Sequence, residues 1–373
     1  MSEFDDEWNL EDDLIHLNHA AVGPWPKRTV AAVTQFAAEN ARLGSCNYTK
    51  WLAKEIKLKQ QLKTLINAHS TDEIALLKNT SEGLSFVAYG LHWAKGDNIV
   101  ISAEEFPSNR IVWESLKSLG VEIRRVDLHS GISPEDNLIK HCDKNTALLA
   151  ISSVQYSSGL CIDLPVLGKY CTQNDIRFCV DAIQSIGSLV TDVQTWQADF
   201  VVADAHKWML APEGIALFYC RQSLLETLKL NEYGWHMVEH LGDYDRIDWS
   251  PAKTARRFEC GSPNMLGIHA MSASLSLLLE VGMAEVEKQV LANSAFLINA
   301  LSDNSNISLI SPVEDARRAG IVNFKHPSIS AENLYEKLKA NNVLCAMRGG
   351  GVRFSPHYYT PPSKMEFAIE LCI

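Results

Sequence analysis

The sequence lacks several features that mark specialised classes of protein. Its nine cysteines form no C-x-x-C pair, which argues against a zinc ribbon and favours reduced thiols over a disulfide framework. No apolar run approaches the roughly 18 residues that a membrane span needs. The first residues, MSEFDDEWNLEDDL, are acidic and lack the basic and apolar regions of a secretory signal. These absences predict a cytoplasmic protein without a membrane partner.

Positive charge is also in deficit. Lysine and arginine number 34 against 45 aspartates and glutamates, a net charge of −11, so the surface as a whole does not predict nucleic acid as a partner. The composition, 46% hydrophobic and 21% charged, excludes a disordered chain. A length of 373 residues is enough for two domains.

Short apolar runs alternate with helical stretches through the first two-thirds of the chain. This pattern is typical of a parallel sheet covered by helices on both faces. The last two runs are too close for a crossover helix, so we expect an antiparallel or edge arrangement there. The predicted strands are Ile99–Ser102, Val121–Val126, Ala147–Ser152, Ile176–Val180, Phe200–Ala203 and Ile215–Tyr219, and helices are expected over Ser108–Leu119 and Leu164–Asn174.

The last third has a mixed α+β pattern and predicts a second, smaller domain. We place the boundary near Leu278, which gives a large domain of residues 18–278 and a small domain of residues 1–17 and 279–373. The elements expected there are helices over Asn264–Val281, Ala284–Leu301 and Ala331–Ala340, and strands over Ile321–Phe324, Val343–Met347 and Val352–Ser355.

Two polar motifs follow consecutive predicted strands. Asp181 ends one strand, and His206 and Lys207 follow the next. Ligands bind in α/β sheets at the carboxyl ends of parallel strands, so the carboxylate and the amine are expected to meet there. Pyridoxal phosphate needs such a pair: a lysine forms the Schiff base, and a carboxylate faces the pyridinium nitrogen. Taken separately, Asp181 as a helix cap and Lys207 as a solvated lysine are the simpler interpretations.

Thr80 and Ser81 precede an apolar helical stretch. Either is a good helix N-cap, and the free N–H groups of that helix terminus also suit a phosphate. The residues alone leave both interpretations open.

These motifs together resemble the class V aminotransferase family of fold type I pyridoxal-phosphate enzymes, which includes cysteine desulfurases, kynureninases and isopenicillin-N epimerase-like proteins. The resemblance spans nearly the whole chain and implies a large domain with a mostly parallel seven-stranded sheet. The matching segments are LNHAAVGPWP (17–26), KNTSEGLSFVA (78–88), VDAIQSIG (180–187), ADAHKWMLAPEGIALFY (203–219), RFECGSPN (257–264) and VRFSPHYYT (352–360).

The resemblance implies roles for individual residues. Lys207 would hold the cofactor and carry the substrate α-proton, and Asp181 would face the pyridinium nitrogen. Ser262 matches a residue that reaches the phosphate in the neighbouring subunit, which predicts a homodimer with shared sites. The other implied cofactor contacts are Gln184 at the phenolic oxygen, Thr80, Ser81 and His206 at the phosphate, and Phe106 stacked on the ring.

The substrate is expected to be a small amino acid. Arg353 matches the family's carboxylate-binding arginine, because a guanidinium holds a carboxylate through two parallel hydrogen bonds. Arg348 is its competitor in the sequence. His19 and Gln155 are expected on the substrate side, and no metal site is predicted.

Three departures from the family pattern bear on the reaction. Cysteine desulfurases carry a nucleophilic cysteine on a mobile loop, but Cys345 lies in a short strand-like run, as a core cysteine does. Phe106 replaces the usual histidine; it can stack on a ring but cannot accept a proton, although a core position is equally compatible. Asp204 replaces a serine near the expected phosphate, where a carboxylate is unfavourable unless it is paired.

The sequence therefore predicts a pyridoxal-phosphate-dependent aminotransferase or lyase. A cysteine desulfurase or selenocysteine lyase type of enzyme and an amino-acid epimerase are the alternatives, because all use the same residues. A non-catalytic pyridoxal-binding module would need an added DNA-binding domain or a lost lysine. A nucleotide-binding enzyme would need a glycine-rich fingerprint after its first strand, and the run Arg348–Gly351 lacks a following helix.

Overall fold

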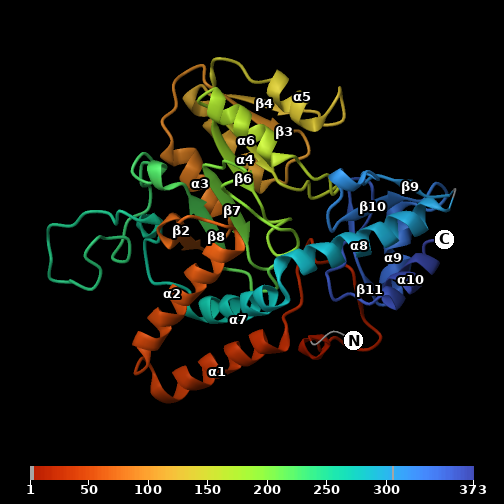
Figure 1. The fold of residues 1–373 in the computed structure, drawn as a ribbon, viewed down its shortest axis with the longest axis horizontal. Coiled ribbons are helices and arrows are strands. Elements are labelled where there is room, and N and C mark those ends of the chain that lie inside the picture. Colours follow the sequence, from red (N-terminus) through yellow and green to blue (C-terminus); the bar gives the residue numbers. More distant parts are fainter. Residues whose placement is uncertain (1–3, 305) are drawn as a thin grey trace.

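A seven-stranded sheet forms the centre of the molecule in the computed structural model, which describes residues 4–304 and 306–373 (Figure 1). Its strand order is β2-β8-β7-β6-β5-β3-β4. The strands are β2 (Ile74–Leu77), β3 (Asn98–Ser102), β4 (Glu122–Val126), β5 (Thr146–Ser152), β6 (Arg177–Asp181), β7 (Phe200–Asp204) and β8 (Ala216–Cys220).

The mostly parallel sheet predicted from the sequence is confirmed. Strands β4, β3, β5, β6 and β7 are parallel neighbours, whereas β8 runs antiparallel to β7, as the short connection between them requires. The edge strand β2, antiparallel to β8, was not among the strands expected from the residues. Its four residues are too few to show a periodic pattern.

Helices cover both faces of the sheet. Alternate residues of each strand point to opposite faces, so each strand contributes side chains to two cores. In β6, Phe178 and Val180 belong to one core cluster, and Cys179 between them belongs to the other. The first cluster includes side chains of α2 (Tyr48–Leu65), α5 (Pro134–Lys140), α6 (Leu164–Gln173) and α7 (Met265–Val281), and the second includes side chains of α3 (Thr80–Gly90) and α4 (Ser108–Glu114).

A smaller α+β part lies at the end of α8 (Met283–Ser302), which runs from α7 towards it in Figure 1. Its four-stranded sheet has the order β12-β13-β10-β9, and β1 pairs in parallel with β11 from the other end of the chain. The remaining elements are α1 (Lys27–Leu43), which packs on α7, and β1 (Ile15–His16), β9 (Ser308–Leu309), β10 (Val322–Lys325), α9 (Ala331–Ala340), β11 (Val343–Leu344), β12 (Ala346–Arg348), β13 (Gly351–Phe354) and α10 (Pro362–Glu370).

Helix α8 packs on both parts. Val286 and Val290 belong to the large core, whereas Leu297 and Leu301 belong to the core of the small part, together with Leu17. The predicted boundary at 278 lies in the last turn of α7. We propose the division into 18–278 against 1–17 and 279–373, with α8 packed on both cores.

Among the helices of residues 4–304 and 306–373, none is by itself both long and apolar enough to cross a membrane. Helices α7 and α8 pass that test only as a pair, and they meet at a bend of 83°.

Candidate active site

Parallel strands deliver polar side chains to one edge of the large sheet. Strand β6 ends at Asp181 and β7 ends at Asp204. Gln155 follows the end of β5, and Glu105 follows the end of β3. Because the carboxyl ends of parallel strands meet at one edge, residues far apart in the sequence form one site, as the sequence predicts for Asp181 and Lys207.

Lys207 lies almost fully buried at this edge. Burial lowers the pKa of its amine to about 8, against the attraction of Asp181, and the positive charge of Arg353 lowers the pKa further. The amine nitrogen is 5.6 Å from the centre of the Phe106 ring. An amine with a pKa of about 8 is in part neutral near neutral pH, so it can accept a proton.

Asp181 is buried beside this amine. Burial raises the pKa of its carboxyl group to about 6, and a hydrogen bond from the Ile183 N–H and the charge of Lys207 oppose that shift. The nearby Asp204 carboxylate raises the pKa of Asp181 further. A cation or a protonated nitrogen placed against Asp181 therefore stabilises its charged form.

Asp204 occupies the N-terminal end of α3. Its Oδ1 accepts a hydrogen bond from the Thr80 N–H (3.1 Å), and its own N–H donates to Thr80 Oγ1 (3.0 Å). Burial raises the pKa of Asp204 to about 6. The Thr80 N–H expected at a phosphate is thus already bound to a carboxylate, although the Thr80 hydroxyl still has its own proton to donate.

His206 and Ser81 are the chain neighbours of the segments that make this contact. The buried Nδ1 of His206 has no hydrogen-bond partner among the described residues and lies 3.9 Å from Asp204 Oδ2. Burial lowers the pKa of His206 to about 4, so its ring is neutral near pH 7. Ser81 is exposed on the first turn of α3, with its hydroxyl 3.0 Å from that of Ser108.

Gln184 is held by two hydrogen bonds. Its amide donates to Ala20 O (3.0 Å) and accepts from the Trp208 indole N–H (2.9 Å). The second amide hydrogen remains for a ligand, as the predicted contact with a phenolic oxygen requires.

Phe106 does not belong to the hydrophobic core. Its ring is 40% exposed, faces the Lys207 amine and makes an edge contact with Tyr156. This position suits a stacking face for a flat ligand.

Arg353 is a buried guanidinium without a carboxylate partner among the described residues. Its side chain is 1% exposed, Nη1 donates to Tyr156 O (2.6 Å), and Nε has no partner. Burial, followed by the charge of Arg348, lowers the pKa of Arg353 to about 9, so the group remains charged near neutral pH. Such an arginine is suited to bind an anion.

His19 lies behind the site. It is fully buried, with Nδ1 at 2.9 Å from Ser355 O and Nε2 at 2.6 Å from the Tyr359 hydroxyl. Both ring nitrogens are therefore engaged, and in this arrangement His19 supports the end of the Arg353 strand and offers no free polar atom to a substrate.

Gln155 is positioned by a residue that the sequence analysis did not identify. Its Nε2 donates to Glu105 Oε1 (3.2 Å), and its buried Oε1 has no partner among the described residues. Glu105 also accepts hydrogen bonds from Ser152 and Asn109, and burial raises its pKa to about 7. The sequence signal was available, because Glu105 directly precedes Phe106 at the end of a predicted strand.

Two other sequence candidates lie apart from this group. Ser262 is exposed and lines a surface pocket of about 220 Å³ with Lys78 and Glu82. Cys345 is buried in the core of the small part, where burial raises the pKa of its thiol to about 12. A thiol with that environment is a poor nucleophile.

A buried cluster of possible metal ligands lies outside the site. One ligand atom from each of Glu55, His236 and Glu259 can lie within 4.8 Å of the others. Lys59 Nζ already sits 3.3 Å from Glu55 and 2.8 Å from Glu259. The ammonium group thus supplies the cation that these two carboxylates need.

Comparison with known proteins agrees with this geometry. The family model described as aminotransferase class-V matches residues 15–357. The chain belongs to the class V aminotransferase family. A probable cysteine desulfurase of Methanothermobacter thermautotrophicus is 29% identical over 95% of this chain and 92% of its own, and an uncharacterized aminotransferase, YcbU, of Bacillus subtilis is 26% identical over 87% and 84%.

Solved structures share the fold. A cysteine desulfurase from Thermococcus onnurineus superimposes with a TM-score of 0.87 at 24% identity, covering 97% of this chain and 94% of its own. A structure of C-DES with glycine covalently linked to its pyridoxal-phosphate cofactor superimposes with a TM-score of 0.88 at 21% identity, covering 96% of both chains.

The protein is a pyridoxal-phosphate-dependent enzyme of the transferase or lyase type. The residues at this edge of the sheet fit that cofactor. The buried Lys207 amine lies near the Asp181 carboxylate and faces the 40% exposed Phe106 ring, and the buried His206 Nδ1, 3.9 Å from Asp204 Oδ2, has no hydrogen-bond partner among the described residues. Arg353, whose Nε has no hydrogen-bond partner among the described residues, lies close enough for its charge to lower the pKa of Lys207.

Proposed function

We propose that this enzyme acts on a small amino acid through Lys207, as an aminotransferase or a lyase. The observation that carries the proposal is the buried Lys207 amine, with its pKa lowered to about 8, among Asp181, Phe106 and Arg353. Lys207, Asp181 and Arg353 are buried ionisable groups. Burying charged groups is unfavourable unless a ligand completes their pairing.

Each of these residues has a separate role in the proposed reaction. When bound, pyridoxal phosphate supplies an electron sink that stabilises negative charge on the substrate's α-carbon. Lys207 holds the cofactor and, at Nζ, accepts and returns the α-proton. Asp181 keeps a proton at the ring nitrogen by its negative charge. Arg353 fixes the substrate carboxylate and thereby sets which α-carbon bond faces Lys207.

The position of Cys345 favours this reaction class over a desulfurase that forms a persulfide on its own cysteine. Its thiol is almost fully buried and packs in the core of the small part, where burial raises its pKa to about 12, so it is a poor nucleophile. The desulfurase and epimerase alternatives share Lys207, Asp181 and Arg353. They differ in which bond breaks after the α-proton has moved.

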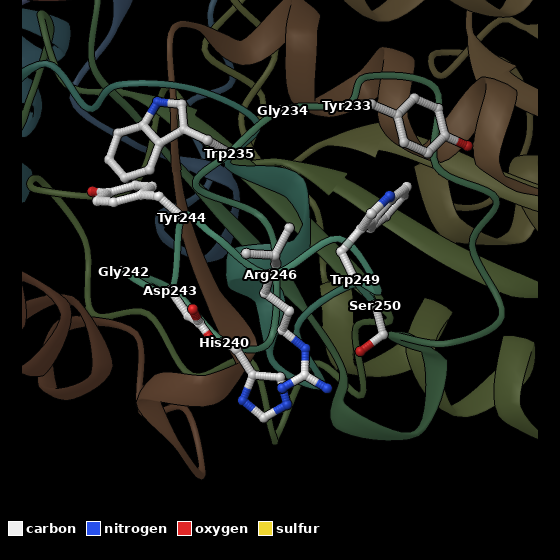
Figure 2. Close-up of a pocket in the computed structure, with 11 residues that line it drawn as sticks. Tyr233, Gly234, Trp235, His240, Gly242, Asp243, Tyr244, Arg246, Trp249 and Ser250 are labelled. Atoms are coloured by element: carbon white, nitrogen blue, oxygen red, sulfur yellow. The ribbon is translucent and has the colours of Figure 1, made fainter.

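We propose further that the enzyme is a homodimer in the cytoplasm. Between β8 and α7 a long segment leaves the body of the molecule (Figure 1), and Figure 2 shows its aromatic side chains around a pocket of about 410 Å³. Trp249 and Tyr244 line this pocket, which contains none of the residues around Lys207. The same segment leads to Ser262, the residue proposed to reach a second subunit's site. All nine cysteines are free, as suits a reducing compartment.

The cofactor linkage is tested by colour and by reduction. The purified protein is expected to be yellow, and borohydride is expected to bleach the visible band and to attach the cofactor's mass to the peptide that contains Lys207. Lys207→Ala should abolish both signals, whereas Lys229→Ala, at an exposed lysine, should leave both unchanged. A protein that remains colourless with added cofactor, or an adduct that survives in Lys207→Ala, contradicts the proposal.

The reaction class needs a separate screen. Amino acids should be tested for keto-acid formation, for sulfide release and for exchange of the α-hydrogen. We expect keto acid or an elimination product, and unchanged rates in Cys345→Ser. Sulfide release from cysteine that disappears in Cys345→Ser would establish the desulfurase alternative instead.

A further inference from the structure

The small sheet that carries Arg353 carries a second arginine on the same face. In the antiparallel pair of β12 and β13, Ala346 lies opposite Arg353, and Arg348 lies opposite Gly351. Directly opposed residues share a face, and so do residues two apart on one strand. Arg348 and Arg353 are therefore diagonal neighbours, at a separation that long side chains can bridge.

This face is turned towards the cofactor side of the molecule. The alternate residues of β13, Val352 and Phe354, pack in the core of the small part. Arg353 points the other way and donates to Tyr156 O, in the turn that follows β5. Because Arg348 shares a face of the sheet with Arg353, its side chain also leaves the strand on the side that faces Tyr156.

The tip of the hairpin is fixed against this turn. The Asn323 amide, opposite Arg353 on β10, donates to both Ser157 O and Arg348 O at 3.0 Å. Gly349 has a left-handed φ of 54°, which favours glycine, and a Cβ atom there would also require the Ser157 hydroxyl to turn away. The charge of Arg348 is consequently near enough to lower the pKa of both Lys207 and Arg353.

No carboxylate of the described residues pairs with Arg348. Its guanidinium is exposed and donates only to the adjacent Met347 O. Lys325, on β10, adds a third positive charge beside Gly350 at the hairpin tip. Glu104, which reaches the turn through Ser158, is already bound to that hydroxyl and to His129. Three cations without an acidic partner are unusual in a chain with a net charge of −11.

We propose that Arg348 binds a second carboxylate, so that the substrate is an amino acid with a side chain ending in a carboxylate. Arg353 holds the α-carboxylate and Arg348 holds the distal one, and the two guanidinium groups fix the substrate at both ends. This inference rests on the proposed function, because it names the substrate class of the same site. Bidentate binding to a planar guanidinium gives the discrimination against a neutral side chain.

The test compares acidic amino acids with their amides in the cofactor-loaded enzyme. One of the two acids, aspartate or glutamate, should be the better substrate. For that acid we expect the kcat/KM of the wild type to exceed that for the matching amide, asparagine or glutamine, by roughly 10-fold or more. Arg348→Gln should lower kcat/KM for that acid by on the order of 10- to 100-fold, and should change the value for the matching amide by less than about 3-fold. Arg348→Lys should recover part of the loss, since it keeps the charge without the planar fork.

A binding measurement provides a readout that is independent of turnover. Glutarate should shift the thermal midpoint of the wild type more than that of Arg348→Gln, whereas butyrate should act alike on both. Arg177→Gln, at the opposite end of β6 from Asp181, is the control and should behave as wild type.

The outcomes separate the two proposals. A wild type that prefers the amides, or an Arg348→Gln variant that loses acids and amides equally, overturns the role of Arg348 and leaves the proposed function intact. If no amino acid of either kind perturbs the visible band or yields product, the proposed function itself fails.

Discussion

At the scale of single residues, burial shifts the pKa values of the reactive groups. Lys207, Asp181 and Asp204 lie at one edge of the large sheet, and each has a pKa displaced towards its neutral form. Asp204 is bound to the Thr80 N–H, where a phosphate is expected. A protonated Asp204 can donate to a phosphate oxygen, whereas an ionised one repels it, so Asp204 links the occupancy of this position to pH.

Glu105 leads to a prediction about the pH dependence of stability. Burial raises its pKa to about 7. A raised carboxyl pKa gives a stabilising contribution that is complete below the ordinary value near 4.5 and is lost as the pH rises through 7. The unfolding free energy of wild type, relative to that of Glu105→Gln, should therefore fall by about 3 kcal/mol between pH 4.5 and pH 8.

Urea unfolding of both proteins across that range measures this difference. If the unfolding free energies of the two proteins change in parallel with pH, Glu105 has an ordinary pKa despite its four hydrogen bonds. Glu105 would then not be a pH-sensitive support of Gln155.

At the scale of elements, the loop before α1 supports the segment that carries the lysine. The Gly23 N–H donates to His206 O (2.8 Å), and a Cβ atom at Gly23 would collide with the Lys207 carbonyl oxygen. The segments 17–26 and 203–219, both part of the family resemblance, are thus in direct contact.

Gly23→Ala is expected to displace the Lys207 backbone. Overpacking of this kind should lower the unfolding free energy by about 1–3 kcal/mol and weaken retention of the cofactor. Urea unfolding and titration of the visible band with added cofactor measure the two effects. Gly261→Ala, where a Cβ atom meets nothing within 4 Å, is the matched control. A Gly23→Ala protein that retains the cofactor normally would show that the loop can move aside.

At the scale of the whole molecule, the proposed dimer makes a prediction about the segment between β8 and α7. Ile247 is 93% exposed in the single chain and lies in the same segment as Tyr244 and Trp249 of Figure 2. If this segment contacts a second copy, Ile247→Asp buries a charge in the interface and should shift the protein towards monomer in sedimentation velocity. Ile132→Asp, at a 94% exposed isoleucine elsewhere, should not. An unchanged dimer in Ile247→Asp would exclude this segment as the contact.

The sequence by itself determined six of the seven strands of the large sheet and the order of the reactive residues at their ends. Strands such as Phe200–Asp204 are recognisable because continuous apolar runs are typical of sheets buried on both faces. Their ends locate Asp181 and Lys207, because the carboxyl edge of such a sheet collects ligands. The match of segment 352–360 to the family indicated Arg353 before its unpaired guanidinium was visible.

Only the tertiary structure decided which side chains face the cofactor side. Cys345 and Arg348 lie three residues apart, yet the first packs into the small core and the second starts from the face that carries Arg353. A shift of one residue in the pairing of β12 with β13 would exchange the two faces, and the sequence of a short strand does not specify that register. Glu105 and His19 depend in the same way on partners 47 and 336 residues away, which only the folded chain brings within hydrogen-bonding distance.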